Sequence, residues 1–142
     1  MELTRFIIYS VYVSELDQGD NETIHRAHVQ TLEASRTPYK LLFGVYKGML
    51  EKSIIRAFVG SSEADLDHKA DCFRRSYHQE TVLLYSQQDR SVRTIDMLGS
   101  RHFGYMHEVS EPMAKELGNY SYRPDTDSYF VISKFYHLIE AA

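Results

Sequence analysis

Three segments of the sequence carry apolar residues at consecutive rather than alternate positions: Phe6-Ile7-Ile8, Leu41-Leu42-Phe43 and Val82-Leu83-Leu84. Each lies in a run rich in β-branched, aromatic or leucine side chains that is typical of a strand. Successive side chains of a strand point to opposite faces, so these strands place apolar groups on both faces of their sheet. The fold must therefore cover the sheet on both sides.

The order of the predicted elements indicates a fold class. Asp20 or Asn21 can cap a first helix, whose inward face is expected to carry Ile24 and His28. Ser62 begins a capping-box pattern before a second helix. The order β-α-β-β-α-β predicts an α+β, ferredoxin-like sandwich, in which four antiparallel strands carry both helices on one face. The expected strands cover residues 5–14, 40–49, 51–59 and 80–86, and the expected helices cover residues 21–36 and 63–78.

The last third of the chain is expected to extend or flank this sheet. Short strands are predicted over 91–98, 102–109 and 129–135, with a helical turn over 110–117. No repeat or linker interrupts the pattern, so residues 1–142 are expected to form a single domain.

A ferredoxin-like sheet leaves one face bare, yet the strands here are apolar on both faces. Large exposed apolar patches are rare on monomers, so self-association is the simplest cover. Ferredoxin-like domains that pair through their open sheets commonly form trimers. The sequence therefore predicts a homotrimer.

Composition removes several classes of function. With 16 basic and 20 acidic residues the net charge is −4, which does not favour nucleic acid as a partner. The single Cys72 and the isolated pair His25 and His28 provide no metal-ligand set, so no metal is expected. No apolar run is long enough to cross a membrane and no signal peptide is recognisable, so a cytoplasmic location is expected.

Several polar residues that are candidates for ligand binding or catalysis lie in the central hairpin. Gly44 lets a ligand approach the backbone, while Tyr46, Glu51 and Ser53 supply an aromatic ring, an anion and a hydroxyl. A second polar cluster, Tyr77-His78-Gln79-Glu80-Thr81, lies where the second helix gives way to the strand over 80–86. Both clusters have an ordinary alternative, namely a plain glycine hairpin and a plain helix-to-strand connection.

These segments carry a resemblance. The strand from Phe6 to Ser14, the helix from His25 to Leu32, the pattern G-x-Y-x-G-x-x-E-x-S over 44–53 and the segment from Gln79 to Tyr85 resemble the phage-encoded S-adenosylmethionine lyases, formerly called hydrolases. The resemblance implies a trimer similar to the nitrogen-regulatory PII proteins, with active sites between subunits. It also implies cleavage of S-adenosylmethionine to 5′-methylthioadenosine and homoserine lactone, without a cofactor, as a phage defence against host restriction.

The same resemblance implies roles for individual residues. Glu51 is expected to hold the cationic part of the substrate, and Tyr46 to add a cation–π face or a hydroxyl. Ser53, Gln79 and Glu80 become candidate contacts to the substrate amine, ribose or adenine.

Two other functions remain open at this point. A hydrolase of the same substrate would use Glu51 or Glu80 as a general base on water and form homoserine directly. A non-catalytic, PII-like trimer would bind a nucleotide on the same hairpin without turnover.

Overall fold

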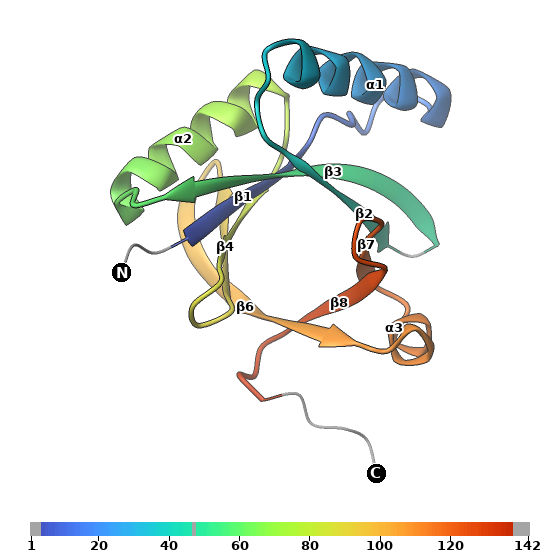
Figure 1. The fold of residues 1–142 in the computed structure, drawn as a ribbon, viewed down its shortest axis with the longest axis vertical. Helices are drawn as coiled ribbons and strands as arrows, with labels where there is room; N and C mark the ends of the chain where they lie inside the picture. The colour runs from blue at the N-terminus through green and yellow to red at the C-terminus, as the bar shows by residue number, and fades with distance from the viewer. Residues whose placement is uncertain (1–3, 47, 138–142) are drawn as a thin grey trace.

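The computed structural model describes residues 4–46 and 48–137, in which eight strands and three helices follow one another along the chain. Figure 1 looks into a ring of strands, with α1 and α2 together on one side and α3 on the other. The strands are β1 (Thr4–Ser10), β2 (Lys40–Tyr46), β3 (Met49–Val59), β4 (Val82–Ser86), β5 (Ser91–Asp96), β6 (Gly99–Val109), β7 (Tyr120–Arg123) and β8 (Ser128–Ser133). The helices are α1 (Gln18–Ala34), α2 (Glu63–Ser76) and α3 (Glu111–Leu117).

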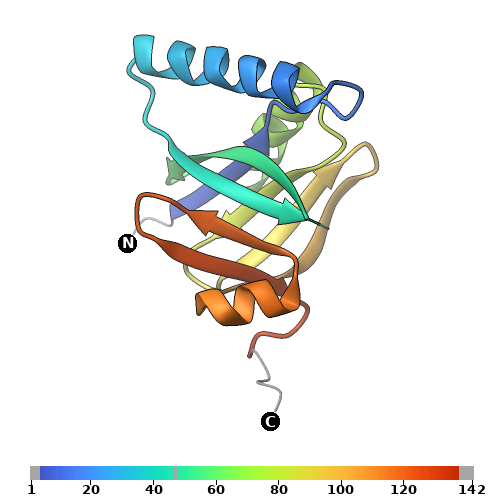
Figure 2. The ribbon, with the colours of Figure 1, turned by 90° about the vertical axis from the view of Figure 1, so that its right-hand side faces the viewer.

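The strands form a closed antiparallel barrel in the order β1-β3-β2-β7-β8-β6-β5-β4. The predicted ferredoxin-like sandwich is therefore wrong. The predicted β-α-β-β-α-β order is present, and its strands are neighbours in the order β4-β1-β3-β2. However, β5 pairs with β4 and β7 pairs with β2, and the later strands join these two edges (Figure 2). Closure satisfies both sheet edges, which an open four-stranded sheet would leave unpaired.

Closure also explains the strands that are apolar on both faces. One set of side chains, including Ile7, Ile54 and Leu84, packs outward beneath the helices with Leu66 of α2. The other set faces the barrel interior and includes the buried residues Ile8, Leu42, Val92 and Met106. The second face of the sheet is thus covered by the chain itself. The argument for a trimer depended on an uncovered face, so that argument no longer holds.

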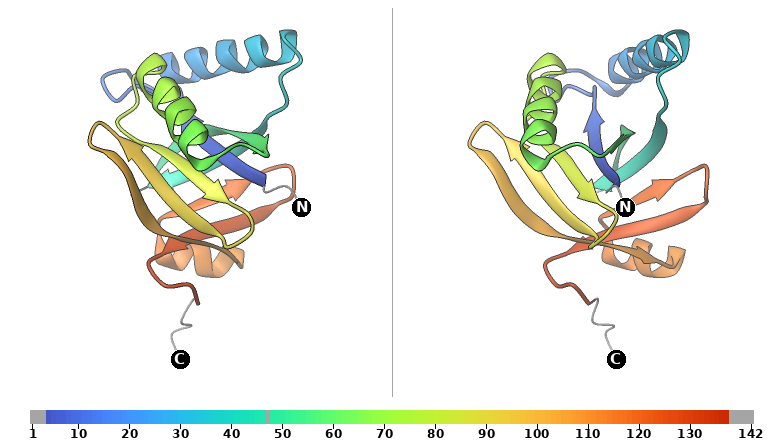
Figure 3. Two further views of the ribbon diagram at one scale, coloured as in Figure 1. Left: turned by 90° about the vertical axis from the view of Figure 1, so that its left-hand side faces the viewer. Right: turned by 60° about the vertical axis from the view of Figure 1, so that its left-hand side comes forward.

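Helix α1 differs from its predicted position. Asp17, rather than Asp20 or Asn21, is the N-cap, and its side chain accepts a hydrogen bond from the backbone N–H of Asp20 at 2.8 Å. The helix begins earlier than predicted, and its buried face carries Asn21, His25 and Leu32, while Ile24 is exposed. Figure 3 shows α1 and α2 covering the same side of the barrel.

The predicted capping box of the second helix is confirmed. Ser62 accepts from the backbone N–H of Asp65 at 3.1 Å and begins α2. Ser110 caps α3, and Gly118 ends it with a φ of 85°, a left-handed conformation that favours glycine. Helix α3 packs on β7 and β8, the hairpin that completes the barrel.

Candidate active site

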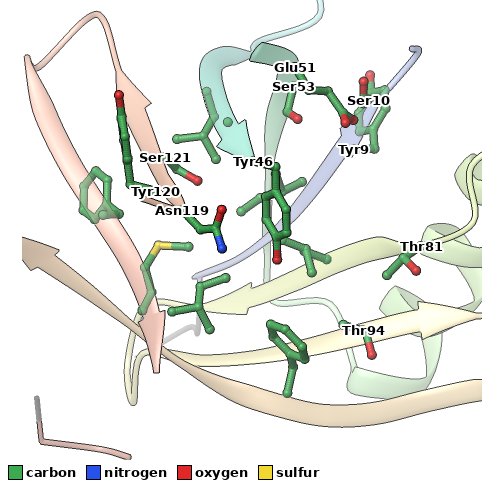
Figure 4. Close-up of a pocket in the computed structure, with 18 of the residues that line it drawn as sticks. Tyr9, Ser10, Tyr46, Glu51, Ser53, Thr81, Thr94, Asn119, Tyr120 and Ser121 are labelled. Atoms are coloured by element: carbon green, nitrogen blue, oxygen red, sulfur yellow. The ribbon is translucent and has the colours of Figure 1, made fainter. Parts of the chain in front are cut away.

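A cavity of about 820 Å³ occupies the barrel interior, and all eight strands contribute to its lining. It lies within the range of volumes typical of small-molecule sites. The interior core residues Ile8, Leu42 and Met106 form apolar parts of the wall. The labelled side chains in Figure 4 show the polar part, which includes Tyr46, Glu51 and several hydroxyl groups. The cavity therefore combines an apolar wall with a few polar groups.

The central hairpin contributes four of the predicted residues to this cavity: Gly44, Tyr46, Glu51 and Ser53. The register of β2 and β3 explains why they lie together, because Gly44 pairs with Glu51 and alternate residues of a strand share a face. Ser10 on β1 pairs with Ser53 and adds a second hydroxyl residue to the same wall.

Gln79 also lines the cavity, from the connection between α2 and β4. Its side-chain amide donates to the carbonyl oxygens of Tyr12 at 2.7 Å and Tyr77 at 3.0 Å. Both N–H groups are thus used to hold two backbone connections, which leaves the side-chain oxygen for a ligand. Glu80 is exposed and does not line the cavity, whereas its neighbour Thr81 does.

Glu51 is an exposed carboxylate on the cavity wall, and it makes no hydrogen bond or ion pair with another residue of the described ranges. The adjacent cation, Lys52, lies on the opposite face of β3. Its ammonium pairs with Glu22 of α1 at 2.8 Å and lies over the ring of Phe43. Lys52 is therefore engaged outside the barrel, and the charge of Glu51 can act on a ligand.

Behind the hairpin, a polar layer connects β3 to α1. The Tyr12 hydroxyl donates to Glu22 at 2.7 Å, and Ser10 Oγ donates to the carbonyl oxygen of Lys52 at 3.0 Å. Hydrogen bonds from Lys52 and then Tyr12 lower the pKa of Glu22, so it stays ionised. These contacts hold the backbone between Glu51 and Ser53, through Ser10 on the cavity side and through the Glu22–Lys52 pair on the side of α1.

Two histidines of α1 lie in the same layer. His25 is buried and its Nδ1 has no hydrogen-bond partner among the residues that the structure describes, while Nε2 of His28 lies 2.7 Å from the hydroxyl of Tyr9. Burial lowers the pKa of both, followed by the charge of Lys52 for His25 and that of Arg56 for His28. Both side chains are therefore neutral in the folded protein at neutral pH.

This arrangement predicts a loss of stability in mild acid. In the unfolded chain a histidine takes up a proton near its ordinary pKa of 6.5, whereas in the folded protein the pKa of His25 is lower. Below a pH of about 6.5 the unfolded state therefore binds more protons than the folded state, and the free energy of unfolding falls. Urea denaturation at pH 7.5 and pH 5.5 measures the difference. His25→Phe keeps a ring without a titratable group and is expected to reduce the difference. A pH dependence equal to that of the wild type in this variant would contradict the assignment.

The rest of the cavity wall was not predicted from the sequence. Thr94 and Asp96 of β5, Arg101, His102 and Phe103 of β6, and Asn119, Tyr120 and Ser121 at the start of β7 line the cavity. Asp96 accepts from the backbone N–H of Leu98 at 2.8 Å and pairs with Arg101; these two interactions, in that order, lower its pKa. Only the long-range strand pairing of the barrel brings these residues to the cavity, those of β5 and β6 across from the hairpin and those of β7 beside β2. No local motif marks them.

Within residues 4–46 and 48–137, no group of three or more histidine, cysteine, aspartate and glutamate side chains is placed to hold a metal ion. In the same ranges, no helix is both long and apolar enough to cross a lipid bilayer.

A closed antiparallel barrel with a partly polar internal cavity has the architecture typical of barrels that bind small molecules. A model of the S-adenosylmethionine lyase family matches residues 7–133. The chain belongs to this family and is an enzyme, an S-adenosylmethionine lyase. The family assignment confirms the resemblance found in the motifs and decides against a non-catalytic nucleotide-binding module. A comparison with curated proteins finds no match.

Proposed function

We propose that the enzyme cleaves S-adenosylmethionine into 5′-methylthioadenosine and homoserine lactone by using the nucleophile that the substrate carries. The substrate carboxylate attacks Cγ, a carbon–oxygen bond forms, and the Cγ–sulfur bond breaks. The bonding electron pair goes to the sulfonium sulfur, which leaves as a neutral thioether. The step balances without a proton donor, a water molecule or a covalent enzyme intermediate.

The carboxylate of Glu51 on the cavity wall, which pairs with no other residue of the described ranges, is the observation that carries this proposal. The methionine end of the substrate has a sulfonium and an α-ammonium, and both are cations that a carboxylate stabilises. By holding this end, Glu51 keeps the chain folded so that the substrate carboxylate reaches Cγ. An intramolecular step of this kind gains its rate mainly from correct positioning.

Other lining residues support the same geometry. The ring of Tyr46 is largely exposed at the cavity and can lie against the sulfonium, a cation–π contact. Ser53 and Gln79 line the cavity, and we assign the hydroxyl of Ser53 and the side-chain oxygen of Gln79 to polar groups of the substrate. Gly44 pairs with Glu51 and, having no side chain, leaves room for the substrate beside that carboxylate.

The products decide between this lyase step and direct hydrolysis. Incubation with S-adenosylmethionine followed by NMR is expected to show homoserine lactone before any homoserine. In ¹⁸O-labelled water, attack of water on Cγ would label the γ-hydroxyl of homoserine. Opening of a lactone at its acyl carbon labels the carboxylate instead. Label on the γ-hydroxyl would contradict the lyase step and support hydrolysis with Glu51 as general base.

We further propose that the enzyme acts in the cytoplasm of a phage-infected host, where it depletes the methyl donor used by restriction-modification systems. Expression in a host cell is expected to lower S-adenosylmethionine and to raise 5′-methylthioadenosine. An unchanged pool of S-adenosylmethionine with active enzyme present would contradict this role.

A further inference from the structure

The wall opposite the hairpin contains a β-bulge. Val92 of β5 pairs with Gly104 of β6, but the next residue, Arg93, pairs with His102. Phe103 is therefore the extra residue, with no partner on β5. A bulge redirects the side chain at its position and often lies beside an active site. Here Phe103 lines the cavity and remains 48% exposed.

The position of the bulge is held by close backbone packing. A β-carbon at Gly104 would collide with the carbonyl oxygen of Ser133 on β8, so only glycine fits there. This close approach keeps β6 against β8 immediately after the bulge. Phe103 is thus presented to the cavity by a rigid strand and not by a free loop.

The strand order places Phe103 across the barrel from Glu51. Strand β6 is four strands away from β3 in either direction around the eight-stranded ring. Figure 4 shows Glu51 and Ser53 on one side and Thr94, from the strand next to β6, on the other. A ligand held at its charged end by Glu51 therefore extends toward the β5–β6 wall.

We infer that Phe103 is the purine-binding residue of the site and that the adenine of S-adenosylmethionine stacks on its ring. This inference rests on the proposed function, in which Glu51 holds the opposite end of the same substrate. Adenine is the planar aromatic part of the substrate, and an exposed phenyl ring in a cavity offers it a matching face. Phe103 then determines specificity for adenosyl sulfonium compounds, whereas it has no part in breaking the carbon–sulfur bond.

The test compares Phe103→Leu, which keeps an apolar side chain, with Phe103→Tyr, which keeps the ring. Phe103→Leu is expected to weaken binding of 5′-methylthioadenosine by about tenfold in calorimetry, as loss of a base-stacking ring does. Because stacking stabilises the bound substrate and the transition state alike, KM for S-adenosylmethionine rises by about the same factor while kcat stays within about twofold. Phe103→Tyr is expected to restore both values.

Leu98→Ser is the matched control, because Leu98 is an exposed apolar residue of the same hairpin that does not line the cavity. Wild-type affinity of Phe103→Leu for 5′-methylthioadenosine would overturn the inference, and wild-type turnover measured alongside would leave the proposed function standing. Conversely, absence of turnover in the wild type together with weaker binding in Phe103→Leu would overturn the proposed function alone. A wild-type protein that neither binds nor cleaves the substrate would overturn both.

Discussion

Glu51→Gln is expected to lower turnover of S-adenosylmethionine by at least about tenfold, equivalent to roughly 1.4 kcal/mol of barrier. Glutamine has nearly the same shape, but it lacks the charge that we assign to holding the cationic end of the substrate. The exposed position of Glu51 means that the fold is expected to survive the change. The measurement is kcat and KM from release of 5′-methylthioadenosine.

Glu108→Gln provides the matched control. Glu108 is also an exposed strand glutamate, but it does not line the cavity, so turnover is expected to stay at the wild-type level. Circular dichroism and thermal unfolding show whether both variants keep the fold. Near-wild-type turnover in Glu51→Gln would remove Glu51 from the proposed role.

Gly104→Ala is expected to lower the free energy of unfolding by roughly 2–3 kcal/mol, because the new methyl group collides with backbone and cannot be relieved by a side-chain rotation. The substitution is expected to weaken the pairing of β6 with β8, which holds one side of the barrel closed. Urea denaturation measures the change.

Gly44→Ala is the control for stability. Both glycines lie in strands, but a β-carbon at Gly44 would lie 3.7 Å from the carbonyl oxygen of Glu51, which is ordinary contact. This variant is expected to unfold within about 0.5 kcal/mol of the wild type, as substitutions without a steric conflict do. Equal stability of the two variants would contradict the role given to the β6–β8 approach.

Local signals in the sequence predicted most elements. Ser62 and Ser110 begin helices as predicted, and the hairpin turns at Gly48 with a φ of 79°. The missed element is β7, whose four residues are too few for a periodic pattern. It is nevertheless the strand that pairs with β2 and completes the ring.

The site residues likewise divide into those that a local pattern predicts and those that only long-range pairing brings to the cavity. Gly44, Tyr46, Glu51 and Ser53 lie on two adjacent strands, so their proximity follows from one hairpin and alternate spacing. Phe103 comes from a strand on the far side of the barrel, and its exposure to the cavity depends on a bulge. Neither a long-range strand pairing nor a bulge leaves a periodic mark in a single sequence.

The sequence by itself determined that both faces of the central strands must be buried, because Phe6-Ile7-Ile8 and its counterparts place apolar groups on each face. Only the tertiary structure decided what covers the second face. The cover is not a second subunit but the barrel's own far wall, since the pairing of β2 with β7 joins segments distant in the chain. That closure turned an apolar sheet face into an internal cavity, and with it brought Glu51 opposite Phe103.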